Sequence, residues 1–115
     1  MTFSAMALKD HAKSLGFNRV GITAATPSPH LNAYLDWVES GMHGAMGYLA
    51  RPDRLDRRRD LNVILPGARS MVLVGVDYRA HVSESLLADP SRGRIASYAW
   101  NMDYHDVVTP MLEEL

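Results

Sequence analysis

The sequence predicts an α/β (α+β) domain in which a small mixed sheet is flanked by helices. Three observations support this fold class. Segments with helical and with strand periodicity alternate along the 115 residues. Residues 70–78 form a near-continuous apolar run, which is typical of a strand buried on both faces. Residues 104–115 carry an apolar stripe at helical spacing.

The first elements follow from periodicity and from end signals. Apolar residues at helical spacing over residues 8–15 predict a first helix, which Ser4 caps and Gly16 ends. Residues 19–23 predict a short strand.

The second helix is predicted to begin at Ser28-Pro29, because a capping hydroxyl followed by proline is a common helix start. Gly41 should end it, and residues 42–50 should form a glycine-interrupted turn or a short helix. Gly41 and Gly44 have two interpretations: a helix end with a turn, or a close backbone approach to a ligand.

Residues 51–60 form a dense charge run. Its arginines have two interpretations, a clamp for a phosphate or carboxylate or a solvated surface loop, and the loop is the commoner case. Asp60 is predicted to cap a short helix that reaches Leu65 and stops at Pro66-Gly67.

The second half of the chain predicts two more strands. Residues 70–78 should form a central strand, residues 79–93 a long surface connection, and residues 94–100 another strand.

The last helix is predicted to start after Asp103 as its N-cap. Pro110 lies inside this helix and should kink it or end it early. The apolar stripe still continues at Leu115, which predicts a domain that is incomplete at the C-terminus. The uncovered stripe leaves self-association through this helix open.

Composition excludes several classes of protein. Apolar residues make up 47% and charged residues 22%, which is ordinary for soluble globular domains. The net charge of −1 argues against a protein that coats nucleic acid. Without cysteine, the chain alone can hold no disulfide, no thiolate zinc and no iron–sulfur cluster. Since neither a signal peptide nor a membrane span is apparent, we expect a cytoplasmic protein without membrane association.

Common functional motifs are absent from the sequence. The glycines form neither a GxGxxG pattern nor a P-loop, and no Ser-based nucleophile elbow is present. No cluster of His, Asp and Glu has metal-ligand spacing, so the sequence predicts no metal site.

Asp103-Tyr104-His105 is the strongest candidate for chemistry. An acid, a phenol and an imidazole meet where a predicted strand gives way to a helix, and such junctions often line clefts. They could supply acid–base groups or polar contacts to a cofactor. Alternatively, Asp103 only caps the helix, Tyr104 packs and His105 is exposed.

Pieces of the whole chain match a known pattern in order. They are residues 15–22, Leu35-Asp36-Trp37, residues 41–48, Arg58-Arg59-Asp60, residues 65–70, Tyr78 and residues 98–107. On these residues the chain resembles the N-terminal region of epoxyqueuosine reductases, which complete the queuosine nucleoside of tRNA.

The resemblance implies an oxidoreductase that reduces epoxyqueuosine to queuosine with cobalamin and 4Fe–4S clusters. Residues 1–115 would be the N-terminal part of its cobalamin-binding domain, which is similar to nitroreductase-like folds. The corrinoid would be shared with a missing ferredoxin-like domain, and the tRNA-binding part would also be missing. The proton-donating aspartate and the cluster-binding cysteines of the family lie beyond Leu115, so this chain alone should be inactive.

By position, Arg58 resembles the family arginine that approaches the cofactor. The region of Ala96 and Ser97, together with Asp103, Tyr104 and His105, resembles the wall of the same cavity. These six residues are the predicted cofactor-binding set, and no catalytic residue is predicted within the chain. The sequence departs from many relatives at Ser97 and at Asn101, where arginine and glycine are common; asparagine tolerates positive φ better than most residues.

Two other functions remain open from the sequence. One is a stand-alone corrinoid- or flavin-binding module without catalysis. The other is a structural module for protein contacts.

Overall fold

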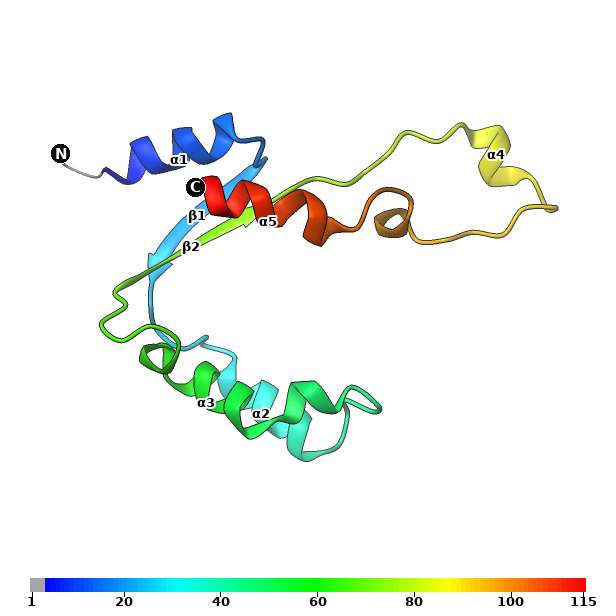
Figure 1. Ribbon diagram of the computed structural model, residues 1–115. Helices are drawn as coiled ribbons and strands as arrows, with labels where there is room; N and C mark the ends of the chain where they lie inside the picture. The colour runs from blue at the N-terminus through cyan, green and yellow to red at the C-terminus, as the bar shows by residue number, and fades with distance from the viewer. Residues whose placement is uncertain (1–3) are drawn as a thin grey trace. The chain divides into compact units, whose positions relative to one another are not determined.

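The computed structural model describes residues 4–115 and divides into two compact units. We call residues 4–21 and 73–115 the terminal unit, and residues 22–72 the central unit. Figure 1 labels the α-helices and the strands. In chain order the elements are α1 (Ala5–Ser14), β1 (Arg19–Ala24), α2 (Leu31–Glu39), η1 (Gly47–Ala50), α3 (Pro52–Arg59), η2 (Leu61–Val63), β2 (Ser70–Gly75), α4 (Glu84–Ala88), η3 (Ser97–Ala99) and α5 (Tyr104–Glu114).

The sheet contains β1 and β2. Hydrogen bonds flank both ends of the strand pair. At one end the Asn18 N–H donates to the Gly75 carbonyl at 2.9 Å, and at the other the Ala25 N–H donates to the Arg69 carbonyl at 3.1 Å. One strand's numbers rise while the other's fall, so the pair is antiparallel. The α/β prediction is confirmed, but the described sheet is antiparallel rather than mixed.

Two strand predictions need correction. β2 ends at Gly75, and Val72 and Leu73 are 41% and 55% exposed, so β2 is not a strand buried on both faces within residues 4–115. The physical reason is that a strand is buried on both faces only where other elements pack over them, and the exposed Val72 and Leu73 lack that cover; β2 also has a partner strand along one edge only, so it is not central within residues 4–115. Residues 94–100 form no strand either: Ser97–Ala99 form the short helix η3, in which the Ala99 N–H donates to the Ala96 carbonyl at 3.0 Å and the Trp100 N–H to the Ser97 carbonyl at 3.2 Å, so these donors bond locally and not to another strand.

The end of α1 anchors the terminal unit. The Ser4 hydroxyl accepts a hydrogen bond from the Ala7 N–H at 3.1 Å, as predicted. At the other end Gly16 has a φ of +105°, and the Phe17 N–H donates to the Ala12 carbonyl at 3.2 Å. This Schellman arrangement turns Phe17 back onto the helix. Ala12 and Phe17 are the two buried hydrophobic residues of the described chain.

α5 begins where it was predicted and reaches Glu114, near the end of the predicted apolar stripe. Asp103 accepts a hydrogen bond from the His105 N–H at 2.9 Å and so caps the helix. The helix continues through Pro110 to Glu114, so of the two effects expected at this proline, a kink or an early end, the early end does not occur. Proline removes one helical N–H, while Met111, one position later, packs near Gly16 and supports the last turns. The connection over residues 79–93 also contains α4.

α2 starts two residues after the predicted first helical position. Ser28 to Leu31 form a turn, in which the Leu31 N–H donates to the Ser28 carbonyl at 3.0 Å, so Pro29 precedes the helix instead of opening it. Gly41, with a φ of +68°, ends α2 as predicted. The stretch after it contains only the short helix η1.

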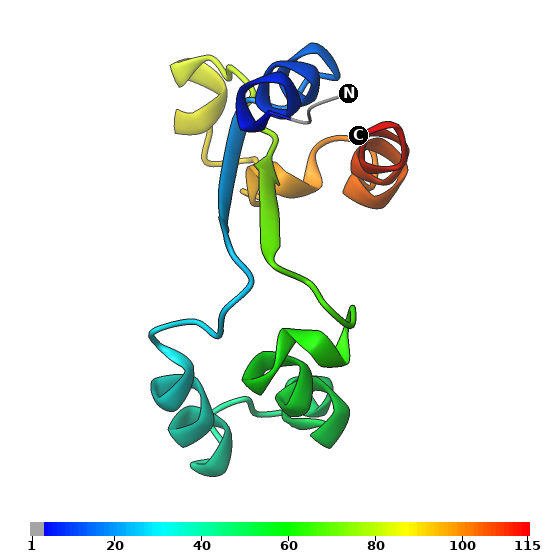
Figure 2. The ribbon, with the colours of Figure 1, turned by 90° about the vertical axis from the view of Figure 1, so that its left-hand side faces the viewer.

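Most of the charge run 51–60 forms the helix α3, Pro52–Arg59, and not the loop that its composition favoured. Pro52 occupies the first turn of α3 with Asp53, and Arg57 to Arg59 occupy the last turn. Acid at the start and base at the end both match the helix dipole. Asp60 then caps η2 through the Asn62 N–H at 2.9 Å, as predicted, although η2 spans three residues only. Figure 2 shows α2 and α3 next to one another, and they are in contact.

Across residues 4–115, no helix combines the length and the apolar character needed to cross a membrane.

Candidate functional site

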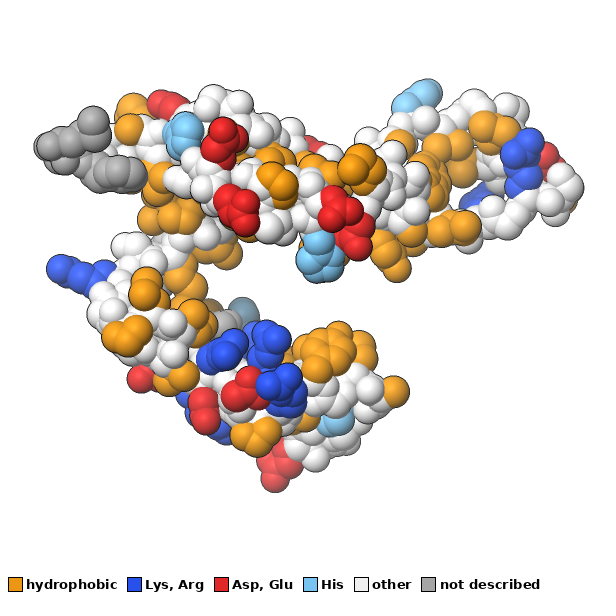
Figure 3. All heavy atoms as spheres, in the orientation of Figure 1, with side chains coloured by type: hydrophobic (Ala, Val, Ile, Leu, Met, Phe, Trp, Pro, Cys, Tyr) orange, Lys and Arg blue, Asp and Glu red, His pale blue; other side chains and the backbone are white. Residues whose placement is uncertain are grey.

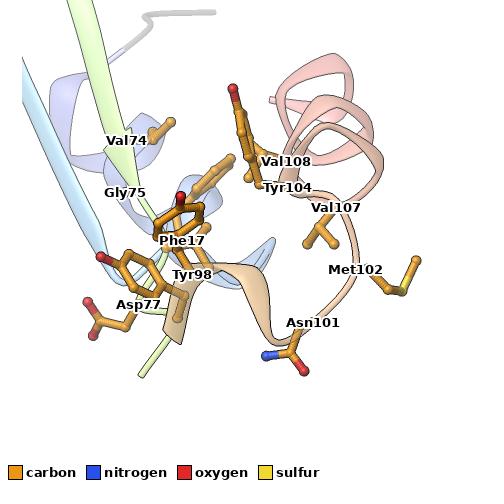
Figure 4. Close-up of a pocket in the computed structure, with 12 residues that line it drawn as sticks. Phe17, Val74, Gly75, Asp77, Tyr98, Asn101, Met102, Tyr104, Val107 and Val108 are labelled. Carbon is orange, nitrogen blue, oxygen red and sulfur yellow. The ribbon is translucent and has the colours of Figure 1, made fainter. Parts of the chain in front are cut away.

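The terminal unit contains an open hollow of about 530 Å³ (Figure 4). Aromatic and aliphatic side chains from three parts of the unit line it. The lining residues are Phe17, Val74, Gly75, Val76, Asp77, Tyr78, Tyr98, Asn101, Met102, Tyr104, Val107 and Val108. A volume of this size lies within the range of small-molecule pockets.

Local folding explains why these residues meet. The chain leaves β2 at Gly75 and brings Asp77 and Tyr78 to one side. The first turns of α5 present Tyr104, Val107 and Val108, which belong to the apolar stripe predicted from spacing. Phe17, fixed by the end of α1, contributes from the third side. The hollow therefore joins segments that lie far apart in the sequence.

Asp103 and His105 form a hydrogen-bonded pair at the start of α5. Asp103 Oδ1 accepts from His105 Nδ1 at 2.7 Å as well as from the His105 N–H. A carboxylate only accepts, so Nδ1 carries the proton and Nε2 is left to accept when the ring is neutral. The Tyr104 and His105 rings stack with centroids 4.0 Å apart.

The charge of Asp103 follows from these contacts. Two hydrogen bonds lower the pKa of Asp103 below its ordinary value of 3.8. The larger effect comes from the His105 backbone N–H and the smaller one from the His105 ring. The carboxyl is therefore ionised at neutral pH, and both its capping and its ring-orienting roles use the charged form.

The structure separates the predicted site residues into groups. Tyr104 lines the hollow, whereas the side chains of Asp103 and His105 are 61% and 66% exposed and lie outside its lining. Ala96 and Ser97 come just before Tyr98, which does line it. Arg58 belongs to the central unit, where its guanidinium carbon lies 4.2 Å from the centre of the Tyr34 ring.

Several lining residues were not predicted as site residues. Phe17, Tyr78 and Tyr98 belong to the pieces that match the family pattern, but none of them, nor Asp77, was assigned to the site. The available signal was the continuous apolar run over residues 70–78, whose end leads into the hollow. Asn101 also lines it; among residues 4–115, only glycines have positive φ, so Asn101 does not use that conformation.

Residues 4–115 bring no three side chains of His, Asp or Glu close enough together to hold a metal ion. The lining of the hollow is mainly aromatic and aliphatic, and its polar members are the tyrosines, Asn101 and Asp77.

Comparison with known proteins gives consistent results. The family model described as "Epoxyqueuosine reductase QueG, DUF1730" matches residues 58–115. The epoxyqueuosine reductase of Synechococcus sp. (strain CC9605) is 36% identical over 95% of this chain and 33% of its own length. That of Gloeobacter violaceus is 35% identical over 100% of this chain and 34% of its own length. That of Aliivibrio fischeri is 34% identical over 94% of this chain.

No solved structure matches the chain. The chain spans about a third of the length of the curated relatives it matches. The family match covers half of the chain, and the relatives align along nearly all of it. The chain therefore belongs to the family of epoxyqueuosine reductase QueG, DUF1730.

Proposed function

We propose that this chain forms the cofactor-facing N-terminal part of a cobalamin-dependent reductase that converts epoxyqueuosine to queuosine in tRNA. The observation that carries the proposal is the open, aromatic-lined hollow of the terminal unit, in a chain whose relatives are named epoxyqueuosine reductases. In this proposal the protein acts in the cytoplasm, and its macromolecular partner is tRNA.

The residues of the hollow fit a corrinoid. A corrinoid presents a broad apolar macrocycle with amide groups at its rim, and the lining of the hollow combines Phe17, Val107 and Val108 with the polar residues Asn101 and Tyr98. Its volume of about 530 Å³ suits part of such a molecule, so the remaining contacts would come from other polypeptide.

Bound cobalamin would supply a reduced cobalt centre for opening the epoxide. The chain's own contribution is to hold the cofactor and to keep water away from one face of it. His105, held by Asp103 with Nε2 free, would orient a polar nucleoside at the edge of the site. With no cysteine in the chain, ligands for 4Fe–4S clusters would come from residues outside it.

A chimera tests this proposal. This chain replaces the matching third of the Synechococcus enzyme, and conversion of epoxyqueuosine in tRNA is followed by mass spectrometry of the released nucleosides. We expect conversion by the chimera and none by the 115-residue chain alone. Conversion by the chain alone, or a chimera that binds cobalamin but never converts the substrate, would contradict the proposal.

A matched pair of variants tests the hollow itself. Val107 lines it, whereas Thr109 on the same helix does not. In the chimera, Val107→Glu places a carboxylate against the macrocycle and should lower cobalamin binding about tenfold or more, while Thr109→Glu should leave it unchanged. The absorbance of bound cobalamin measures this difference. Equal effects of the two variants would remove the hollow from the proposed site.

The isolated chain offers a further check. Val107 and Leu112 of α5 are 40% and 49% exposed. We expect the isolated chain to self-associate at high concentration, measured by sedimentation, and to bind cobalamin weakly or not at all. A chromophore that copurifies with the isolated chain would instead favour a stand-alone carrier of a corrinoid or flavin.

A further inference from the structure

The central unit contains a second hollow, of about 440 Å³, with a different chemistry. Its lining residues are Thr26, Ser28, His30, Leu31, Tyr34, Arg57, Arg58, Leu61, Ile64 and Met71. Four of them are aliphatic, and the others bring two guanidinium groups, an imidazole and hydroxyl groups. Figure 3 shows basic side chains gathered over the α3 part of this unit.

The position of Arg58 is fixed by an aromatic ring. Its guanidinium carbon lies 4.2 Å from the centre of the Tyr34 ring, a cation–π contact. The Tyr34 hydroxyl donates to the Leu49 carbonyl at 2.8 Å, which holds the ring in place. An arginine stacked in this way keeps its in-plane N–H donors available for an anion.

The arginines in and next to α3 differ in whether they form ion pairs with carboxylates. Arg51 pairs with Asp53 at 2.9 Å and Arg59 pairs with Asp56 at 3.4 Å. Arg57 and Arg58, the two arginines that line the hollow, form no ion pair with any carboxylate of residues 4–115. Arg54 of the same helix is likewise outside these ion pairs but does not line the hollow, so Arg57 and Arg58 are the α3 arginines that combine an unpaired guanidinium with a place in the lining.

Two hydroxyl-bearing residues of the lining add further polar groups. The Ser28 oxygen already accepts from the His30 N–H at 3.1 Å, so its own hydroxyl proton remains available to donate. Thr26 carries a second hydroxyl on the same segment. Leu61 and Ile64 line the same hollow, and apolar neighbours strengthen a charge-assisted hydrogen bond by limiting water.

We propose that this hollow binds an oxyanion, in particular a phosphodiester group, through the Arg57 and Arg58 guanidiniums and the Thr26 and Ser28 hydroxyls. The choice of a phosphodiester rests on the proposed function, since a tRNA backbone and cobalamin both carry that group. The preference for an oxyanion rests on the geometry alone.

Titration with inorganic phosphate tests the oxyanion site. The probe is added to the 115-residue chain, and the NMR signals of the Arg58 Nε–H and the Tyr34 ring are followed. We expect saturable shifts, and Arg58→Gln should weaken phosphate binding about tenfold. Arg54→Gln is the matched control, because Arg54 lies on the same helix outside the lining and should change affinity less than about twofold. Circular dichroism checks that both variants keep their helices.

Two further arms identify the source of the phosphodiester. If it belongs to RNA, Arg58→Gln in the chimera should weaken binding of a tRNA anticodon stem-loop about tenfold and reduce its salt dependence. If it belongs to the cofactor, the variant should abolish the chimera's preference for cobalamin over cobinamide, which lacks the phosphodiester.

Contrary outcomes are equally clear. Equal losses in Arg58→Gln and Arg54→Gln, or no shift of the Arg58 and Tyr34 signals by phosphate, would overturn the oxyanion site. Phosphate binding with no effect of the variant on either RNA or cobalamin would overturn the phosphodiester assignment. Neither result depends on the terminal unit, so failure here differs from failure of the Val107→Glu test.

Discussion

The terminal and central units both contain short helices, but they differ in what is buried and in what lines their hollows. The terminal unit holds the two buried residues of the described chain, Ala12 and Phe17, and its hollow is aromatic and aliphatic. The central unit contains no buried residue, and its hollow is rimmed by arginine. The terminal unit is therefore organised by burial, and the central unit by caps, hydrogen bonds and a cation–π contact.

This difference indicates that the two units are suited to different ligands and are stabilised by different interactions. An apolar hollow suits a flat, weakly polar ligand, and a cationic hollow suits an anion. The same comparison sorts mutations, because burial losses should act on the terminal unit and losses of single hydrogen bonds on the central unit. The following variants test that division, from the largest expected effect to the smallest.

Phe17→Ala should have the largest effect. It removes the main buried side chain of the terminal unit, and such truncations cost about 3 kcal/mol or more. We expect loss of amide protection in α1 and α5 while α2 and α3 change little, measured by hydrogen exchange. Met6→Ala, at a position that is 73% exposed on α1, is the control and should be nearly silent. Equal effects in both units would contradict the division.

Gly16→Ala should destabilise the terminal unit by about 1–2 kcal/mol, because φ at this position is +105°. An added Cβ would also lie 3.3 Å from Met111 Cε. Gly93→Ala provides the comparison, since its Cβ would meet nothing within 4 Å. Urea unfolding curves of the two variants measure the difference, and a neutral Gly16→Ala would show that the helix end is not the anchor.

Tyr34→Phe should weaken the central unit by about 1 kcal/mol, since it removes the hydrogen bond to the Leu49 carbonyl and keeps the ring. We expect faster amide exchange in α2 and weaker phosphate binding, because the ring would no longer be held under Arg58. Tyr48→Phe, at an exposed position, serves as the control. A variant with unchanged phosphate affinity would show that ring anchoring is unimportant.

Acid should remove one contribution from the terminal unit. The folded pKa of Asp103 is lowered, so its stabilisation is present above the ordinary value of 3.8 and is lost as pH falls through the folded pKa. Asp103→Asn still caps the helix, so α5 should lose less protection between neutral and acidic pH. Carbon-detected NMR of the carboxyl gives the midpoint. A midpoint at or above 3.8 would contradict the interpretation.

The elements of this chain were predictable where the signal is local. Ser4 as a cap, Gly16 and Gly41 as helix ends and Asp103 as the start of α5 were all confirmed, because each depends on a side chain or φ value within one turn. The short strand β1 was also predicted, one residue shorter than observed.

The incorrect predictions depend on more distant partners or on competing local bonds. An apolar run such as residues 70–78 does not reveal how many strands flank it, and within residues 94–100 the Ala99 and Trp100 N–H groups bond locally instead of in a ladder. The charge run formed α3 because its acid and base are ordered along the helix dipole, which composition alone does not show.

The candidate site divides in the same way. The sequence by itself identified Tyr104, the Asp103–His105 junction, the apolar stripe of α5 and the arginines of α3. Only the tertiary structure brought Phe17, Tyr98 and the end of β2 around one hollow, and only it placed Arg58 over Tyr34. The physical reason is the sequence separation of the interacting residues. Helix caps and apolar stripes depend on neighbours three or four residues away, whereas a pocket depends on side chains that are far apart in the sequence and meet only in the folded chain.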